Sequence, residues 1–328
     1  MIRSFYIGQD GKIEKELHKD RLAEVLRVQK GLLWVDVCAE PIETSEPLLR
    51  DTFGFHPLAV DDALRETHVP KVDDWGRYLY LVVYACQNDI KYVKQAHFME
   101  LDVFLGRNFL VTYHEKTIPA LDEVWEICPA DERCQTRGAA YLLYKLMDAL
   151  IDQYMRFVEA IDDTMDEIED QVFTEPEADI LEVIFSLKRT LLRLRRIMMP
   201  QREVFNKLSR GDYTIIERVN MFYFRDIYDH VVRLHDISEN MRDLVSGALD
   251  SYLSVVNNRM NEVVKTLTVI TTLFMPLSFL TGFFGMNFFQ AAFPLQAWTG
   301  KLAFVLTIMT LLITPLGMVL WMRRRAWM

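Results

Sequence analysis

The sequence predicts an α+β membrane protein with an N-terminal α/β domain, long helices in its middle and two membrane spans at its end. Short β-rich runs occupy residues 1–115, and apolar residues recur at helical spacing from about Ala139. Two long stretches without charge, Thr266–Gly300 and Leu302–Met322, follow near the C-terminus. A purely soluble protein has no use for such a tail, because membrane-length apolar segments are costly to expose to water.

The α/β domain rests on four strand-like runs, which we place at Leu32–Val37, Tyr78–Tyr84, Phe98–Leu105 and Phe109–Tyr113. Gly106 and the following Arg107-Asn108 pair predict a turn between the last two runs. A helix is expected at Pro57–Glu66. The order of the strands in the sheet stays open at this point.

Three long helices follow. The first runs from about Ala139 to Val172 on a 3.6-residue apolar period, and the second from Pro176 to about Met199. A third begins near Glu217 and meets no strong breaker before Gly282. About 65 residues at 1.5 Å each give about 100 Å, which is far longer than the bilayer core. We therefore expect one stalk helix that continues into the first span.

Positive charge sets the expected orientation. Arg323–Arg325 follow the second span and Lys265 precedes the first, whereas the segment between the spans carries only Lys301. Positive flanks stay in the cytoplasm. We expect both termini inside the cell and an inner-membrane location. The parts are then a cytoplasmic α/β domain (1–138), a cytoplasmic long-helix region (139–265), a first span (266–287), an external loop (288–301), a second span (302–322) and a basic cytoplasmic tail (323–328).

Composition narrows the function classes. The formal net charge of −10 argues against nucleic acid as a partner, since phosphate binding needs clustered Lys and Arg. The four cysteines form no CxxC pair and favour reduced, structural thiols. The sequence contains no P-loop, GxGxxG, HExxH or GxSxG motif, so we expect neither a nucleotide partner nor an enzyme. No prosthetic group is expected either.

A polar stripe runs along the third helix at steps of four and three residues. It changes from carboxylate to amide and then to apolar, hydroxyl and small residues: Asp250, Ser254, Asn257, Asn261, Val264, Thr268, Thr271, Met275, Ser278, Gly282 and Gly285. Such a stripe suits either a close-packed pair of helices or a pore between several copies of one helix. In a pore, Asp250 would form an acidic ring and Asn261 an amide ring. Met275 with Val264 or Leu267 would form apolar constrictions.

The chemistry of the stripe favours a hard cation. The stripe and the loop contain no Cys and no His, which are the ligands that softer metals prefer. Neutral oxygens such as those of Asn287 suit Mg²⁺, which gives up its water shell reluctantly and could be bound through its waters.

At this point the sequence resembles the CorA family of divalent-cation channels. The motif Gly285-Met286-Asn287 follows Phe284 and closes the first of two C-terminal spans. Met275-Pro276-Leu277 and the basic end Arg323–Arg325 are similar to the family pattern. The segments His56–Leu58 with Asp61-Asp62, and Tyr223–His230, are similar as well, so the resemblance covers essentially the whole chain.

The resemblance implies a homopentamer around one central pore, with Gly285, Met286 and Asn287 as the ion filter. It places pore-lining positions at Asp250, Asn261, Val264, Leu267, Met275 and Ser278, and the stripe adds Asn257, Thr271 and Gly282 to the expected lining. It also implies a regulatory Mg²⁺ site between subunits at Asp62 and Asp226. The alternative for these two carboxylates is surface salt bridging, for example with Arg225.

The expected function is a magnesium uptake channel, with cobalt or nickel as further cargo, driven by the membrane potential and gated by cytoplasmic Mg²⁺. Mg²⁺ is then both substrate and regulatory ligand. Family loops carry acidic residues after the motif, whereas Phe288–Pro294 carries none, which leaves the choice of ion open. The alternatives are a zinc or cobalt transporter on the same scaffold, with or without proton coupling, and a non-conducting membrane-anchored sensor or scaffold.

Overall fold

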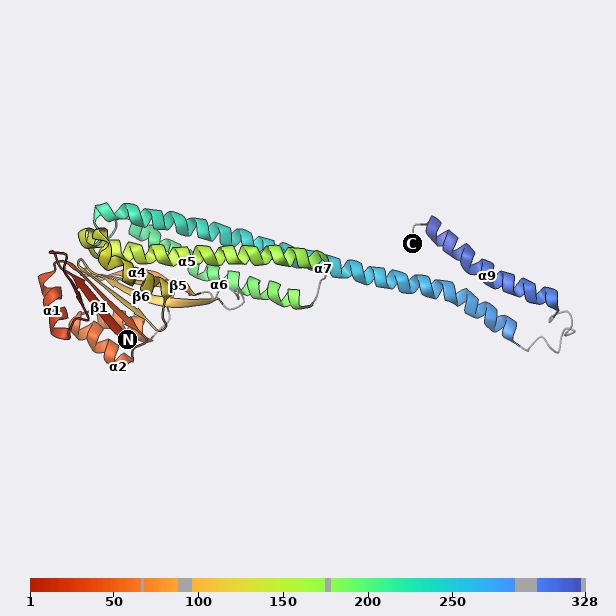
Figure 1. Cartoon of the computed structure of the whole chain (residues 1–328), viewed down its shortest axis with the longest axis horizontal. Helices are drawn as coiled ribbons and strands as arrows, with labels where there is room; N and C mark the ends of the chain where they lie inside the picture. Colours follow the sequence, from red (N-terminus) through yellow and green to blue (C-terminus); the bar gives the residue numbers. More distant parts are fainter. Residues whose placement is uncertain (66–67, 88–95, 175–177, 287–299, 326–328) are drawn as a thin grey trace. The chain divides into compact units, whose positions relative to one another are not determined.

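A computed structural model of the chain describes residues 1–65, 68–87, 96–174, 178–286 and 300–325. The chain divides into two compact units, Met1–Tyr252 and Leu253–Met328. The first unit carries a mixed sheet with helices on both faces and the second is helical (Figure 1). Each unit is described by itself.

Within the described residues, the sheet of the first unit has seven strands in the order β2-β1-β3-β7-β6-β5-β4. Strands β3 and β7 are parallel, and the other neighbouring pairs are antiparallel. The bounds are β1 Ile2–Ile7, β2 Ile13–Lys15, β3 Leu32–Cys38, β4 Lys71–Asp74, β5 Leu79–Gln87, β6 His97–Leu105 and β7 Phe109–His114.

All four strands expected from the sequence are confirmed to within three residues, as β3, β5, β6 and β7. The turn between β6 and β7 is confirmed too, since Gly106 N–H donates to the Phe109 carbonyl at 2.9 Å. The expected helix is α3, Pro57–Arg65, and Glu66 lies outside the described residues. Strands β1, β2 and β4 were not expected. They are short, or they carry charges such as Arg3 and Lys71 that interrupt the alternation of apolar and polar residues typical of a strand.

Alternate residues of the central strands face two cores. Leu33, Val35 and Val37 of β3 lie in a buried cluster with side chains of α1 (Lys19–Val28), η1 (Leu48–Thr52) and α3. A short helix α2, Ile42–Pro47, leads into η1. The opposite face contacts α5 and α6, and Trp34 of β3 packs there against Trp125 of α4 (Pro119–Ile127) at 4.8 Å between ring centroids. A single turn η3, Cys128–Ala130, follows α4.

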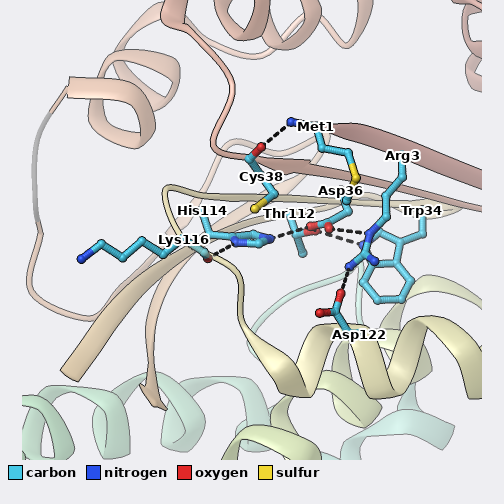
Figure 2. A network of polar contacts seen from close by, with 9 residues as sticks. All are labelled: Met1, Arg3, Trp34, Asp36, Cys38, Thr112, His114, Lys116 and Asp122. Carbon is cyan, nitrogen blue, oxygen red and sulfur yellow. Dashed lines mark hydrogen bonds and ion pairs between the residues drawn. The ribbon is translucent and has the colours of Figure 1, made fainter. Parts of the chain in front are cut away.

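A buried ionic network ties the first strand to the sheet on the α4 side (Figure 2). Asp36 of β3 is fully buried, and its Oδ1 accepts a hydrogen bond from Thr112 Oγ1 at 2.5 Å. His114 Nε2 lies 3.0 Å from the same oxygen, and Arg3 Nε donates to Oδ2 at 2.8 Å. Arg3 also pairs with Asp122 of α4 at 2.6 Å. One carboxylate therefore joins β1, β3 and β7, and Arg3 extends the network to α4.

The long helices follow the apolar period closely. Helix α5 spans Glu132–Thr174 and is kinked at Gly138, whose φ of 71° lies in the left-handed region that favours glycine. The regular part therefore begins at the expected Ala139. Helix α7 spans Arg218–Gly285, which confirms the predicted start near Glu217 and the predicted length.

The predicted end of the second long helix is wrong. Helix α6 begins at Ala178 and continues through Pro200 to Arg210, instead of ending near Met199. Proline costs a helical hydrogen bond, but Val204 and Leu208 beyond it are buried. Gln201 is also buried, and its side-chain oxygen accepts a hydrogen bond from Tyr84 N–H of β5 at 3.0 Å. The tertiary contacts of the residues after Pro200 thus stabilise the continuation of helix α6 to Arg210.

Helix α7 packs on α5 and α6 along one face within the first unit. Tyr223 lies 4.7 Å from the Tyr144 ring of α5, and Glu239 pairs with Arg195 of α6 at 3.1 Å. The buried positions alternate by four and three residues: Asn220, Phe224, Ile227, Val231, Leu234, Ser238, Met241, Val245, Ala248 and Tyr252. The packed face thus ends at the boundary of the first unit.

The second unit contains the rest of α7 and helix α9, Lys301–Arg324. Both helices are long and apolar enough to cross a membrane, with mean hydropathies of 1.7 and 2.1 in their most apolar stretches. The predicted second span at 302–322 lies inside α9. The predicted first span at 266–287 lies in α7 except for Met286 and Asn287. Of the predicted loop and tail, residues 288–299 and 326–328 lie outside the described residues.

Candidate ion pathway and regulatory carboxylates

The polar stripe on α7 is uncovered along its whole described length. Asp250, Asn257 and Asn261 are exposed, as are Thr271, Ser278 and Gly282. The apolar members behave in the same way: Val264 is 55% exposed, Leu267 62% and Met275 67%. Large exposed apolar side chains on one helix indicate a surface that another protein chain or lipid covers.

The stripe starts on the side of α7 that faces away from its packed face. Tyr252 is 8% exposed and is the last buried residue of the packed series, whereas Asp250 is exposed. Two residues at about 100° each separate their directions by about 200° around the helix axis. Asp250 therefore projects away from α5 and α6. This geometry leaves the acidic start of the stripe free to meet other copies of the helix.

Hydroxyl groups of the stripe present acceptor oxygens. Thr268 Oγ1 donates to the Val264 carbonyl at 2.7 Å, and Thr271 Oγ1 donates to the Leu267 carbonyl at 2.9 Å. Each hydroxyl uses its one hydrogen on its own helix, so its lone pairs stay available. A hydrated cation turns the hydrogens of its waters outward. Such oxygens can accept those hydrogens without stripping the cation of water.

The predicted filter lies at the end of the described part of α7. Gly285 is the last residue of the helix, and Met286 N–H donates to the Phe283 carbonyl at 3.3 Å. Asn287 lies outside the described residues. The filter role of Gly285, Met286 and Asn287 therefore stays a prediction.

Asp62 is held in an ion pair on α3. Lys71 Nζ donates to its Oδ2 at 2.5 Å, and His68 Nε2 lies 3.5 Å from its Oδ1. Lys71 also pairs with Asp73 at 3.1 Å. Burial alone would lower the pKa of Lys71, but the hydrogen bonds to the two carboxylates outweigh it and raise that pKa. A metal ion at Asp62 would therefore compete with a firmly charged ammonium.

Asp226 is exposed on α7 and lies near acidic residues of α5 that sequence reasoning missed. Burial, together with the charges of Asp152 and Asp226, raises the pKa of Asp148 despite the opposing Lys145. The signal available in the sequence was the four-residue spacing of Asp148 and Asp152 on one helix face. The charges of Asp152 and Asp226 thus act on the same carboxyl of α5, which makes this part of the surface locally acidic.

The structure does not place Asp62 and Asp226 in one site. Among the described residues, the recorded partners of Asp62 are Lys71 and His68, and no ion pair joins Asp226 to Arg225. No group of three or more His, Cys, Asp or Glu side chains in the described ranges is arranged to hold a metal ion. The regulatory role of Asp62 and Asp226 therefore stays a prediction.

Comparison with known proteins identifies the family. Residues 29–324 match the family model for CorA-like Mg²⁺ transporter proteins. The chain belongs to the CorA family. It is 37% identical over 277 residues to the cobalt/magnesium transport protein CorA of Thermotoga maritima, covering 84% of this chain and 78% of the relative. It is 34% identical over 294 residues to YfjQ, a candidate metal ion transporter of Bacillus subtilis, covering 90% and 89%.

Solved structures share the fold of this chain. The complete CorA magnesium transporter of Methanocaldococcus jannaschii superposes with a TM-score of 0.83 at 23% identity, over 100% of this chain and 99% of that one. The full-length CmaX protein superposes with a TM-score of 0.76 at 21% identity, over 98% and 96%. This CorA-family chain is therefore a membrane protein with an N-terminal α/β domain, a long helix and two candidate spans.

Proposed function

We propose that the chain forms a magnesium uptake channel, with cobalt or nickel as further cargo. The exposed stripe on α7, which begins opposite the packed face of the helix, carries this proposal. An uncovered row of carboxylate, amide and hydroxyl oxygens that continues from the charged part of α7 into its apolar part suits a water-filled pathway for a cation. The CorA family model and the cobalt/magnesium transport relatives support Mg²⁺ as cargo.

The assembly that we propose is a homopentamer in the inner membrane. Five α7 helices surround an axis, with their packed faces turned outward against α5 and α6. Arg323 and Arg324 in the last turn of α9 stay in the cytoplasm by the positive-inside rule. Both termini then lie inside the cell, and the segment that carries Lys301 faces out.

Along the axis, the side chains act in sequence. Rings of Asp250, Asn257 and Asn261 attract and orient the hydrated ion at the cytoplasmic end. Val264, Leu267 and Met275 form apolar constrictions that close by dewetting, and Thr271, Ser278 and Gly282 line the wider parts between and beyond them. The filter of Gly285, Met286 and Asn287 holds the ion by its waters at the outer end.

Gating follows from competition at the carboxylates. In the pentamer, Asp62 of one copy faces Asp226 of the next, and Mg²⁺ displaces Lys71 to bridge them. Asp148 beside Asp226 adds negative charge to the same place. When cytosolic Mg²⁺ falls, the bridge is lost, like charges repel and the closed arrangement weakens. Lys71 thus sets the Mg²⁺ concentration at which the channel closes.

The membrane potential supplies the driving force. A divalent ion that crosses the full field gains about 4.6 kcal/mol per 100 mV. This is enough for uptake without a nucleotide, and the sequence contains no P-loop to bind one.

The test is ion flux into liposomes that contain the full-length protein under an imposed inside-negative potential. We expect Mg²⁺ flux that Asn287→Ala abolishes while the oligomer stays intact by size-exclusion chromatography. Asn258→Ala is the matched control, because Asn258 is an exposed amide on α7 one residue away from the stripe. Undiminished flux in Asn287→Ala contradicts the filter.

The same assay separates the alternatives when Mg²⁺, Co²⁺, Ni²⁺ and Zn²⁺ are compared. Zn²⁺ flux that excludes Mg²⁺ identifies a zinc transporter, and its dependence on a pH gradient reveals proton coupling. Sealed liposomes that pass none of the four ions contradict a channel and indicate a sensor or scaffold.

A further inference from the structure

A cavity of about 420 Å³ lies in the first unit, at the end of the sheet where two hairpins turn. Four segments supply its walls. Its lining includes Arg27 from the end of α1, Thr52 at the end of η1, Arg77 between β4 and β5, and Arg107 and Asn108 between β6 and β7. The carboxylates and the stripe of the proposed channel are absent from this lining.

Three guanidinium groups gather at this cavity. Arg27, Arg77 and Arg107 come from three separate segments and are exposed. No ion pair is recorded for any of the three within the described part of the chain, whereas Arg21 and Arg65 each pair with two carboxylates. Like charges at one site repel, so in a chain of net charge −10 their grouping favours an anion.

Buried polar atoms at the same cavity also lack partners. Asn108 is 6% exposed, and its Nδ2 has no hydrogen-bond partner among the residues that the structure describes. Its position is set by the backbone, because its carbonyl accepts a hydrogen bond from Leu33 N–H at 2.9 Å. Thr52 Oγ1 is likewise buried, and no described residue forms a hydrogen bond with it. Buried donors are nearly always satisfied, so an orphaned amide beside three guanidiniums points to a missing acceptor.

We propose that this cavity binds the phosphoryl group of a small phosphorylated ligand. Guanidiniums match phosphate oxygens through paired hydrogen bonds, and Asn108 Nδ2 and Thr52 Oγ1 supply further donors. The cavity has the size of small-molecule sites, which exceeds the need of one phosphate. Phe53, Tyr78 and Phe109 line the remaining space. The site uses side chains instead of a glycine-rich loop, which is why motif searches of the sequence do not find it.

Isothermal titration calorimetry on the detergent-solubilised full-length protein tests the site, in buffer free of phosphate and divalent metal. Inorganic phosphate, pyrophosphate and ATP are the probes, and sulfate is the comparison anion. Saturable binding of pyrophosphate or ATP is expected. Equal affinities for the two identify the phosphates alone as the recognised group, and tighter binding of ATP identifies a nucleotide as the source.

The double variant Arg77→Gln/Arg107→Gln should weaken this binding by about tenfold or more, because each lost guanidinium removes charge-assisted hydrogen bonds. Arg156→Gln is the matched control, since Arg156 is an exposed arginine of α5 outside the cavity, and it should leave the affinity unchanged. A thermal midpoint equal to that of the wild type shows that the double variant is folded. Binding that survives in the folded double variant, sulfate binding as tight as that of pyrophosphate, or no saturable binding overturns the proposal.

Discussion

Asp250 and Tyr252 lie two residues apart on helix α7 and face opposite sides of it. Tyr252 ends the row of side chains that packs α7 onto α5 and α6, and Asp250 begins the exposed polar stripe. The two rows share an alternating step of four and three residues, so both follow a gently turning line along the helix. One helix thus serves two interfaces, an inner one within the chain and an outer one that we assign to other copies.

The hydroxyls of the stripe should matter for conduction. Thr271→Val keeps the size of the side chain and removes the acceptor oxygen, so we expect Mg²⁺ flux in liposomes to fall several-fold. Thr310→Val is the control, because Thr310 on α9 makes the same bond to its own helix, at 2.9 Å to the Leu306 carbonyl, but lies off the stripe. Equal flux in the two variants would count against the pathway.

The apolar constriction should act as a gate. Met275→Ala removes a large side chain that is 67% exposed, so a ring of five would widen and stay wet. We expect Mg²⁺ flux to persist at internal Mg²⁺ concentrations that close the wild-type channel. Phe274→Ala is the matched control, since Phe274 is 63% exposed on the neighbouring face. Normal closure in Met275→Ala would place the gate elsewhere.

Two substitutions at the proposed regulatory site should shift the internal Mg²⁺ concentration needed for inhibition in opposite directions. Asp226→Asn removes a proposed ligand and should raise the internal Mg²⁺ concentration needed for inhibition, by about tenfold if one charge-assisted contact is lost. Lys71→Met removes the ammonium that holds Asp62 at 2.5 Å and should lower that concentration. Inhibition curves of flux against internal Mg²⁺ measure both. Asp163→Asn, an exposed carboxylate of α5, is the control, and two unshifted curves would favour surface salt bridging.

The network at Asp36 should make stability depend on acid. Burial acts to raise the pKa of Asp36, but His114, Thr112 and Arg3 outweigh it, so the pKa lies below its usual range. The stabilisation that the Asp36 carboxylate gives the folded protein is therefore complete above its pKa in the unfolded chain, about 3.9. It is lost as the pH falls through the lower pKa of Asp36 in the folded protein. At pH 7, Asp36→Asn should lower the free energy of unfolding by about 3–5 kcal/mol. The thermal midpoint should fall accordingly. The difference from the wild type should shrink below about pH 4.

The control for that network is Asp122→Asn. Asp122 pairs with Arg3 but is 54% exposed, so its loss should cost less than about 1 kcal/mol. Thermal unfolding of the full-length protein followed by circular dichroism measures both variants. A difference between Asp36→Asn and wild type that stays constant from pH 7 to pH 3 would contradict the depressed pKa.

Much of the fold was predictable because its signals are local. Strands β3, β5, β6 and β7 are buried runs rich in apolar residues, and the long helices repeat their apolar residues over many turns. Strands β1, β2 and β4 were missed because they are short or interrupted by charge. The end of α6 was missed because Pro200 is a local signal, whereas Val204 and Leu208 are buried by distant elements.

The sequence by itself determined the two spans, the stalk helix, the polar stripe and the family. Hydropathy, helical periodicity and short motifs depend only on the order of neighbouring residues in the chain. Only the tertiary structure decided which side chains lie next to each charged group. It pairs Asp62 with Lys71, brings Asp148 near Asp226 and gathers Arg27, Arg77 and Arg107 at one cavity. Asp148 and Asp226, like the three arginines, are far apart in the chain, and Asp62 and Lys71 belong to separate elements, α3 and β4. Their electrostatics depend on distance and burial, which folding sets and sequence order does not.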